Sequence, residues 1–264
     1  MSPSAQPARP MVLSFAASDP TSGAGAQADV LTLAALGCHP LSVITAVSAQ
    51  DTRGVSELWP LPAYWITEQA RVVLADMRVS AFKAGVLGSA DNVRAVTQVV
   101  ERYRDLPFVV DPVLASGRGD ALAADDAIAA LRETIAPRAT VLTPNSVEAR
   151  RLVPGARTLG ECARRLVEAG SQYVLITGTH EETAEVVNTL YDRHGVVRED
   201  RWPRLAAGYH GSGCTLASAI AARLACGRPV GEAVREAQEF TWQALAAGLE
   251  AGSGQLLPNR FYRR

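Results

Sequence analysis

Short hydrophobic runs alternate along the chain with longer segments in which hydrophobic residues recur at helical spacing. A short apolar run bounded by turn residues predicts a strand that is buried within a sheet. The predicted strands cover residues 11–16, 41–49, 81–86, 107–111, 140–142 and 173–177. Residues 186–191 and 196–202 predict a hairpin, and residues 51–59 predict a small projecting turn or ribbon that could act as a flap.

The segments with helical spacing fall between these strands. They cover residues 27–36, 62–74, 91–103, 125–135, 158–169 and 229–249, and a further helix follows Gly213. Gly37 suits the end of the first helix, because glycine accepts the left-handed backbone found after many helices. Asp91 is predicted to cap the start of the third helix.

Buried strands that alternate with helices indicate right-handed crossovers, and therefore an α/β fold with a mostly parallel central sheet and helices on both faces. No repeat or linker interrupts the pattern, so residues 11–264 are predicted to form a single domain. Residues 1–10 are polar and proline-rich, which predicts a disordered N-terminal tail rather than a signal peptide.

Ligands of such sheets bind at the carboxyl ends of the strands. Several polar residues lie at or just after a predicted strand end, namely Gln50, Asp111, Asn145, Glu148 and Thr177. These residues are expected to meet at one edge of the sheet.

Composition narrows the class of protein. Of the 264 residues, 48% are hydrophobic and 20% are charged, which is typical of a soluble globular protein. The net charge of −1 gives no basic surface for nucleic acid, and no apolar run approaches the ~20 residues of a membrane span. The four cysteines are scattered without metal-site spacing, which favours free thiols in the cytoplasm.

A glycine-rich stretch at residues 208–220 carries the clearest chemistry. Gly211 and Gly213 flank Ser212, and the helical pattern begins directly after them. A glycine turn that opens a helix leaves backbone N–H groups free and suits a phosphate group. Cys214 lies at this helix start, where thiol pKa values are often lowered, so it is predicted to be a base and the most reactive of the cysteines. The alternative is a glycine-rich helix start with a buried cysteine that packs as a small hydrophobic residue.

Several separated stretches, taken in order, resemble one family. They are residues 17–29 (ASDPTSGAGAQAD), 43–54 (VITAVSAQDTRG), 83–85 (KAG), 110–113 (VDPV), 143–145 (TPN) with Glu148, and 210–215 (HGSGCT). Their ordered combination is far more specific than any single motif. Together they resemble the hydroxymethylpyrimidine/phosphomethylpyrimidine kinases of thiamine biosynthesis, which are ribokinase-like.

The resemblance implies phosphorylation of 4-amino-5-hydroxymethyl-2-methylpyrimidine with ATP and Mg²⁺, often followed by phosphorylation of the monophosphate. It also implies a ribokinase-like fold and a homodimer. By position, it implies that the pyrimidine is bound by Ala17, Asp29, Gln50, Val86 and Val113. It places the nucleotide at Asp111, Asn145, Thr177 and Gly178, and Mg²⁺ at Glu148 and Asp111. The catalytic group is Gly211, Ser212, Gly213 and Cys214, with Cys214 as the base.

Other interpretations of these residues stay open from the sequence. Asn145 and Glu148 also fit an ordinary helix start, with Asn145 as the N-cap and Glu148 three residues later. Gln50 could simply end a strand, and Asp29 could be a solvated carboxylate on a helix.

The chain also departs from the family pattern. Ala17 replaces a glycine, and residues 177–180 read Thr-Gly-Thr-His where the family has Lys-Gly-Gly-His. The loop at residues 116–120 lacks another lysine, and Arg118 within it is predicted to contact the ATP phosphates instead. The alternative functions are a pyridoxal/pyridoxine kinase, a thiazole kinase, and a non-catalytic pyrimidine-binding protein on the same scaffold.

Overall fold

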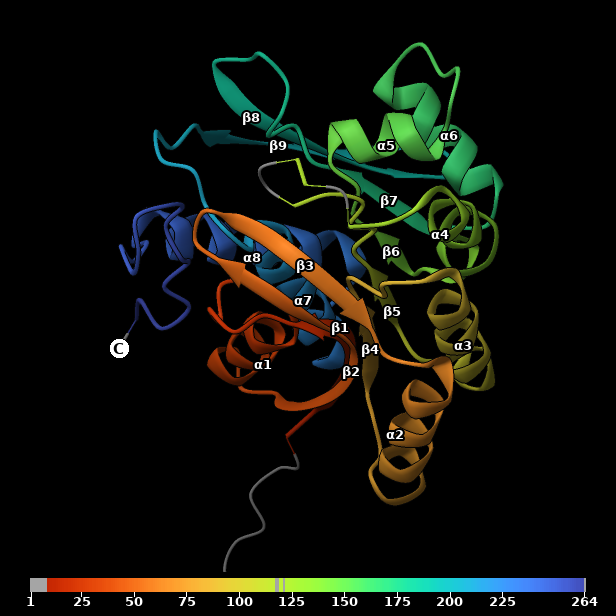
Figure 1. Ribbon diagram of the computed structural model, residues 1–264. Coiled ribbons are helices and arrows are strands. Elements are labelled where there is room, and N and C mark those ends of the chain that lie inside the picture. The colour runs from red at the N-terminus through yellow and green to blue at the C-terminus, as the bar shows by residue number, and fades with distance from the viewer. Residues whose placement is uncertain (1–8, 117–118, 121, 264) are drawn as a thin grey trace, which may run out of the picture.

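A computed structural model describes residues 9–116, 119–120 and 122–263. Within them, nine strands form one sheet in the order β3-β2-β1-β4-β5-β6-β7-β8-β9 (Figure 1). The strands are β1 (Met11–Ser18), β2 (His39–Asp51), β3 (Gly54–Pro60), β4 (Ala81–Ala84), β5 (Phe108–Val110), β6 (Val141–Leu142), β7 (Tyr173–Ile176), β8 (Glu185–Asp192) and β9 (Gly195–Pro203). The pairs from β2 to β7 are parallel, whereas β3, β8 and β9 run antiparallel to their neighbours. The mostly parallel sheet predicted from the sequence is confirmed.

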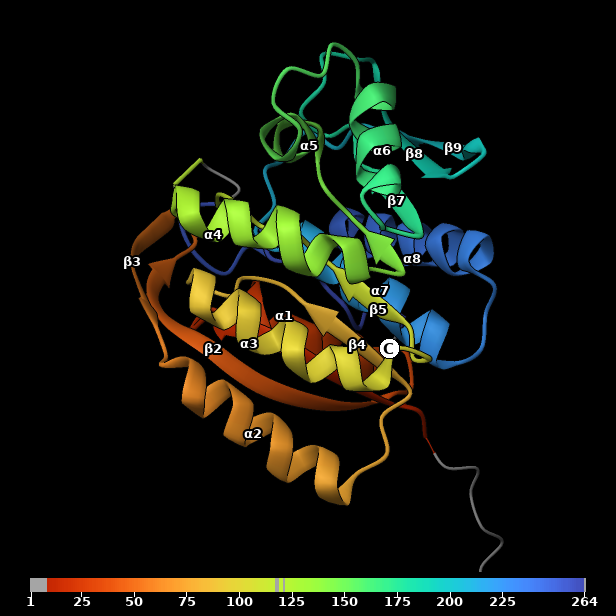
Figure 2. The same ribbon diagram turned by 90° about the vertical axis from the view of Figure 1, so that its right-hand side faces the viewer.

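Helices cover both faces of the sheet (Figure 2). One face carries α1 (Gly25–Ala35), α7 (Ser212–Ala225) and α8 (Val230–Ala246). The other carries α2 (Ala63–Asp76), α3 (Ala90–Val100), α4 (Asp125–Ala130), α5 (Ser146–Leu152) and α6 (Leu159–Glu168). Side chains alternate along β1, so Val12 packs under α1 and α7 while Leu13 packs in the opposite core.

Most of the helices and strands predicted from the sequence lie close to their observed bounds. The predicted ribbon is the end of β2 together with β3, and the second predicted hairpin is β8 and β9. The prediction for the start of α3 was wrong, because the hydroxyl of Ser89 accepts from the backbone of Asn92 and caps the helix. Asp91 instead lies in the first turn, where its charge complements the helix dipole.

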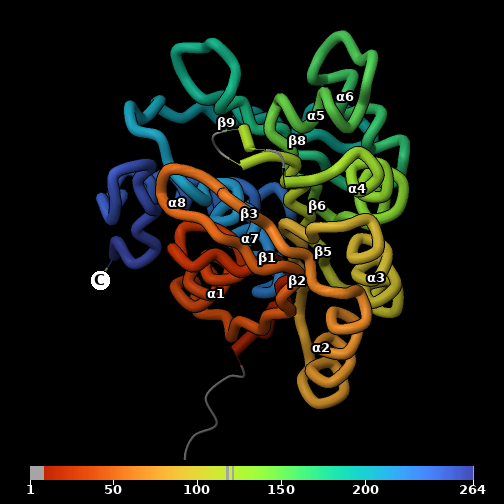
Figure 3. Tube along the Cα trace, in the orientation of Figure 1, coloured from red at the N-terminus to blue at the C-terminus, as the bar shows by residue number. Residues whose placement is uncertain are grey.

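The C-terminal segment returns from α8 to the edge of the sheet where the parallel strands end (Figure 3). The backbone of Gln255 donates to Thr52 in the β2–β3 turn, and Leu256 pairs with the backbone on both sides of Tyr209. The single sheet takes strands from Met11 to Pro203, and the single domain stays a prediction. Most of the predicted tail, residues 1–8, lies outside the described residues. In the part of the chain that the structure describes, no helix has the length and apolar character needed to cross a membrane.

Candidate active site

A cavity of about 440 Å³ opens at the carboxyl ends of the parallel strands, a volume in the usual range of small-molecule sites. Most of the predicted site residues line it, namely Ala17, Gln50, Val86, Asp111, Val113, Asn145, Glu148, Thr177, Gly211, Ser212, Gly213 and Cys214. Two do not, Asp29 and Gly178.

The β2–β3 hairpin and the loop after β5 form one wall of this cavity. Val55 of the hairpin and Ser116 of the loop both line it. The carboxylate of Asp120 joins the two segments, because it accepts from the Val55 backbone at 3.3 Å and from the Ser116 hydroxyl at 2.7 Å. The predicted flap therefore lies over the cavity. Arg118, predicted to contact phosphate from the same loop, lies outside the described residues.

The start of α7 forms another part of the cavity wall. Gly211 is its N-cap residue with a φ of 82°, a left-handed conformation that glycine adopts without cost. A Cβ atom on Gly211 would lie 1.9 Å from the carbonyl oxygen of Gly23, so the two glycine loops are in direct contact. The N–H groups that open the helix have no acceptor within it, and the helix dipole adds positive potential there. This arrangement suits an anionic phosphate group.

Two buried carboxylates, Asp111 and Glu148, line the cavity, and Asp111 lies against the start of α7 at Gly213. Asp111 follows β5, and its Oδ2 atom has no hydrogen-bond partner among the described residues. Burial raises the pKa of Asp111, and Lys83 opposes the shift. Burial and the neighbouring charge of Asp111 raise the pKa of Glu148.

Asn145 and Glu148 form the capping box that the sequence allowed. The Asn145 side chain accepts from the Glu148 backbone at 2.9 Å, and the Glu148 carboxylate accepts from the Asn145 backbone at 2.9 Å. Glu148 also accepts from the backbone of Leu114 at 3.3 Å. Asp111 is therefore the carboxylate with an oxygen left for a ligand. Among the described residues, no cluster of three or more metal-ligating side chains surrounds it.

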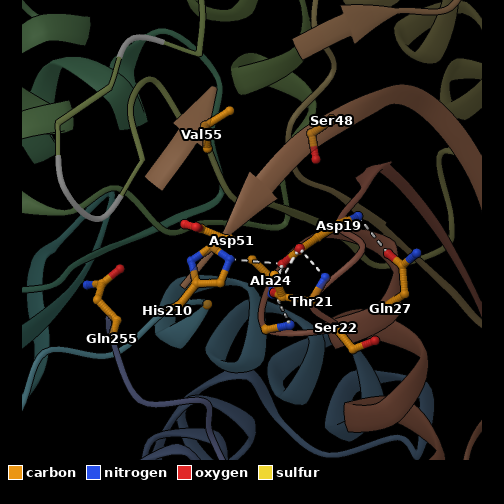
Figure 4. A network of polar contacts seen from close by, with 12 residues as sticks. Asp19, Thr21, Ser22, Ala24, Gln27, Ser48, Asp51, Val55, His210 and Gln255 are labelled. Carbon is orange, nitrogen blue, oxygen red and sulfur yellow. Dashed lines mark hydrogen bonds and ion pairs between the residues drawn. The ribbon is translucent and has the colours of Figure 1, made fainter. Parts of the chain in front are cut away.

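An Asp–His pair that the sequence analysis did not assign joins the two glycine loops (Figure 4). The Nε2 atom of His210 lies 2.8 Å from Asp19 Oδ2. Burial opposes ionisation of Asp19, but hydrogen bonds from His210, Ala24 and Thr21 lower its pKa to about 2. Because Asp19 is ionised, Nε2 is the ring nitrogen that carries the proton. The sequence signal that could have indicated this pair is Asp19, a single carboxylate within a loop of small residues.

Comparison with known proteins identifies the family. The model of the phosphomethylpyrimidine kinase family matches residues 19–259. The chain belongs to this family. A hydroxymethylpyrimidine/phosphomethylpyrimidine kinase of Streptomyces coelicolor is 42% identical over 253 residues, which cover 93% of this chain and 92% of that protein.

Solved structures agree with this membership. Phosphomethylpyrimidine kinase from Clostridium difficile has a TM-score of 0.78 at 31% identity, with 89% of this chain and 99% of that chain covered. Pyridoxal kinase from Staphylococcus aureus, in complex with AMP-PCP and pyridoxal, has a TM-score of 0.87 at 28% identity, with 97% and 96% covered. The fold is therefore shared between pyrimidine and pyridoxal kinases.

The prediction that Asp29 binds the pyrimidine needs correction in this member of the phosphomethylpyrimidine kinase family. Its side chain is fully buried and pairs with Lys83 at 2.9 Å. Its remaining hydrogen bonds come from the hydroxyls of Ser14 and Ser218. Because these partners occupy both oxygens of its carboxylate, Asp29 has no free oxygen for a ligand, and it does not line the cavity.

Asp29→Asn should therefore lower stability and leave the KM of the alcohol substrate nearly unchanged. Removing one partner of a buried ion pair typically costs about 3–5 kcal/mol, because the other charge stays buried without compensation. Urea unfolding and steady-state kinetics measure the two effects. The double variant Asp29→Leu/Lys83→Met serves as the control, since it removes both charges and should recover part of the loss. A large rise in KM at unchanged stability would return Asp29 to the substrate site.

The expected pKa of Cys214 was also wrong. Burial, together with the negative charges of Asp111 and Asp29, raises the pKa of this thiol to about 12 against the opposing charge of Lys83. The local helix start does not offset this burial, which favours the neutral thiol.

Iodoacetamide should consequently label Cys226 first, because Cys226 is exposed while Cys38, Cys162 and Cys214 are buried. Peptide mass spectrometry at short labelling times identifies the modified residue. A Cys226→Ser variant, as the control, should remain almost unlabelled over the same period. Labelling of Cys214 ahead of Cys226 in the native protein would contradict the buried neutral thiol.

Gly178, predicted to bind the nucleotide, serves the packing of β8 instead. Its N–H group donates to the Asn188 side chain at 3.1 Å, and a Cβ atom there would lie 2.3 Å from the carbonyl oxygen of Val187. The neighbouring Thr177 and Thr179 do line the cavity. Arg204, another lining residue that the sequence analysis missed, holds this loop by donating to three of its backbone carbonyls.

Proposed function

We propose that this protein transfers the γ-phosphoryl group of ATP to the hydroxymethyl group of 4-amino-5-hydroxymethyl-2-methylpyrimidine, and then phosphorylates the monophosphate, in thiamine biosynthesis. The observation that carries the proposal is the glycine-opened start of α7, with Cys214 and Asp111 beside it in one cavity. Membership of the phosphomethylpyrimidine kinase family supports the choice of substrate.

The pyrimidine ring fits the part of the cavity between β1, β2 and the loop after β5. Ala17, Val86 and Val113 supply apolar surface for its faces and its methyl group. The Gln50 amide can both donate to a ring nitrogen and accept from the exocyclic amino group. Because Asp29 does not line the cavity, Gln50 is the polar side chain that recognises the ring.

The ATP phosphates fit between α7 and the ends of β6 and β7. Asn145 and Thr177 line this side of the cavity, and a parallel backbone bridge joins them. Mg²⁺ keeps several waters and needs only one or two carboxylates, so the unpaired Oδ2 atom of Asp111 fits it, with Glu148 close behind. When bound, Mg²⁺ neutralises charge on the phosphate oxygens.

The transfer itself forms one bond and breaks one. The substrate oxygen attacks the γ-phosphorus, the bond from that phosphorus to the β–γ bridging oxygen breaks, and ADP leaves. The hydroxyl proton passes to the sulfur of Cys214, which must be a thiolate at that moment. The N–H groups from Gly211 to Cys214 hold the oxygens of the transferring group, where charge is spread in the transition state.

A panel of alcohols tests the function. The aminopyrimidine alcohol, its monophosphate, pyridoxal and the thiazole alcohol are each assayed with Mg·ATP for ADP release. The proposal requires the highest kcat/KM for the two pyrimidines, and Gln50→Leu should reduce it for these alone. Preference for pyridoxal would assign the alternative kinase activity that the fold also supports. Tight pyrimidine binding without ADP release from any alcohol would identify a non-catalytic binding protein.

We infer that the protein is a homodimer, and that the two copies contact each other through the edge strand β3 and the helix α2. Trp59, Tyr64, Trp65 and Val72 are each more than half exposed there, a large apolar surface for one edge. Tyr64 and Trp65 pack edge to face with ring centroids 5.6 Å apart, so their rings form one continuous apolar surface. Light scattering coupled to gel filtration should give a dimer mass, and Trp65→Ser should shift it toward the monomer. A monomeric parent protein would refute the inference.

A further inference from the structure

The C-terminal segment packs against the two glycine loops beside the cavity, which Gln255 lines. After α8, the backbone of Leu256 donates to Gly208 at 2.9 Å, and its carbonyl accepts from His210 at 3.0 Å. Four residues later, Arg260 enters the interior and is only 4% exposed. The match to the family model stops at residue 259, so this arginine lies just beyond it.

The guanidinium of Arg260 connects the two glycine loops. It donates to the carbonyl oxygens of Ser22 and Gly23 in the first loop, the Ser22 bond being 3.2 Å long. Its Nε atom donates to the Thr215 hydroxyl in the first turn of α7 at 3.2 Å. That hydroxyl donates in turn to the carbonyl of Gly211 at 2.8 Å. One planar fork therefore fixes the loop after β1 relative to the start of α7.

The loop that Arg260 holds is under conformational constraint. Ser22 has a φ of 60°, the left-handed region that a residue with a side chain rarely adopts. Such a conformation persists only where the surroundings impose it. The neighbouring Gly23 carries the carbonyl oxygen that lies against Gly211. Arg260 bonds both carbonyls, so it stabilises the loop at its point of contact with the anion site.

Arg260 makes no direct ion pair, although the charges of Asp29 and Asp19 act on it from a greater distance. Among the described residues, no carboxylate oxygen lies within 4.0 Å of a guanidinium nitrogen of Arg260. The hydrogen bonds of this guanidinium go to carbonyl and hydroxyl oxygens. Lys83, the only lysine in the chain, is by contrast paired with Asp29. An arginine stays protonated even when buried. A buried cation that makes no direct ion pair therefore lies behind a site suited to phosphate.

We propose that Arg260 is a positioning residue of the phosphoryl-transfer site. It fixes the first-turn N–H groups of α7 against the loop after β1, and its positive charge favours an anionic group at that helix start. The inference rests on the proposed function for its effect on turnover. Its effect on anion binding is independent of that function.

Kinetics of two Arg260 variants test the positioning. Arg260→Met keeps the length of the side chain without its charge or donors, and kcat should fall about 10²–10³-fold, as when an oxyanion-hole donor is lost. The KM of the alcohol should change little, because Arg260 does not line the cavity. Arg260→Lys keeps the charge but not the fork and should recover part of kcat. The matched control is Arg223→Met, which removes an arginine of α7 that forms an ion pair with Glu236 of α8 at 3.0 Å.

Thermal unfolding in the presence of inorganic phosphate measures anion binding without any turnover. Phosphate should raise the Tm of the parent protein and of Arg223→Met, but not that of Arg260→Met. If no alcohol is phosphorylated yet this pattern holds, the proposed function fails and the role of Arg260 stands. An Arg260→Met variant with parental kcat and a parental phosphate response overturns the inference. If Arg260→Met does not fold, the same two measurements on Arg260→Lys decide, and parental values for both overturn it.

Discussion

Replacing Cys214 with alanine should lower kcat by about 10²–10⁴-fold, the usual contribution of a general base. The cavity, the N–H groups at the start of α7 and the carboxylate of Asp111 all remain in this variant, so activity should fall without disappearing. The KM of the pyrimidine alcohol should stay close to the parental value, because the sulfur acts on the proton of the attacking hydroxyl. Steady-state assays of ADP release measure both constants.

The raised pKa of Cys214 gives this prediction a second signature. A thiol with a pKa of about 12 is mostly protonated at neutral pH. Its thiolate fraction therefore rises about tenfold for each pH unit below that value. If Cys214 is the base, kcat of the parent enzyme should rise with pH across the neutral range, and kcat of Cys214→Ala should not.

The control is Cys162→Ala, which removes a buried cysteine far from the cavity lining and should leave kcat and its pH dependence unchanged. Near-parental kcat in Cys214→Ala would leave Cys214 as a packing residue. The proton would then be assigned to Asp111, the cavity carboxylate with an unbonded oxygen. Asp111→Asn would be the variant to measure next.

The general plan of the fold and the position of the site could be predicted because both depend on local pattern. Short apolar runs become strands buried between two layers of helices, as β1 and β5 show. Parallel strands all end at the same edge, so Gln50, Asp111 and Thr177 meet in one cavity. The resemblance to a family added the substrate, which periodicity could not provide.

Features that depend on contacts between distant segments could not be predicted. Asp29 has the sequence position of a site residue, but Lys83 approaches it from β4 and encloses its carboxylate. The helix start suggested a low pKa for Cys214, whereas burial by several elements raises it. Arg260 lies 45 residues from Thr215, and no spacing rule relates it to the glycine loops.

Gly211→Ala should abolish most of the activity, with kcat lowered by at least the ~10²–10³-fold seen when one oxyanion-hole donor is removed. The new methyl group would lie 1.9 Å from the Gly23 carbonyl oxygen and 2.9 Å from the Cα atom of Ala24, and these backbone atoms cannot rotate away as a side chain could. The two glycine loops must separate, which moves the N–H groups that open α7 and also strains the bonds of Arg260 to Gly23.

Gly227 at the other end of α7 offers a matched control for that substitution. Its φ of 78° is close to the 82° of Gly211, but a Cβ atom on Gly227 would meet nothing within 4 Å. Both alanine variants therefore carry the same left-handed backbone penalty of about 1–2 kcal/mol, and only Gly211→Ala adds the collision. Denaturant unfolding should show a loss of stability in both, whereas kcat should fall in Gly211→Ala alone. Equal kcat values in the two variants would mean that contact between the glycine loops does not position the anion site.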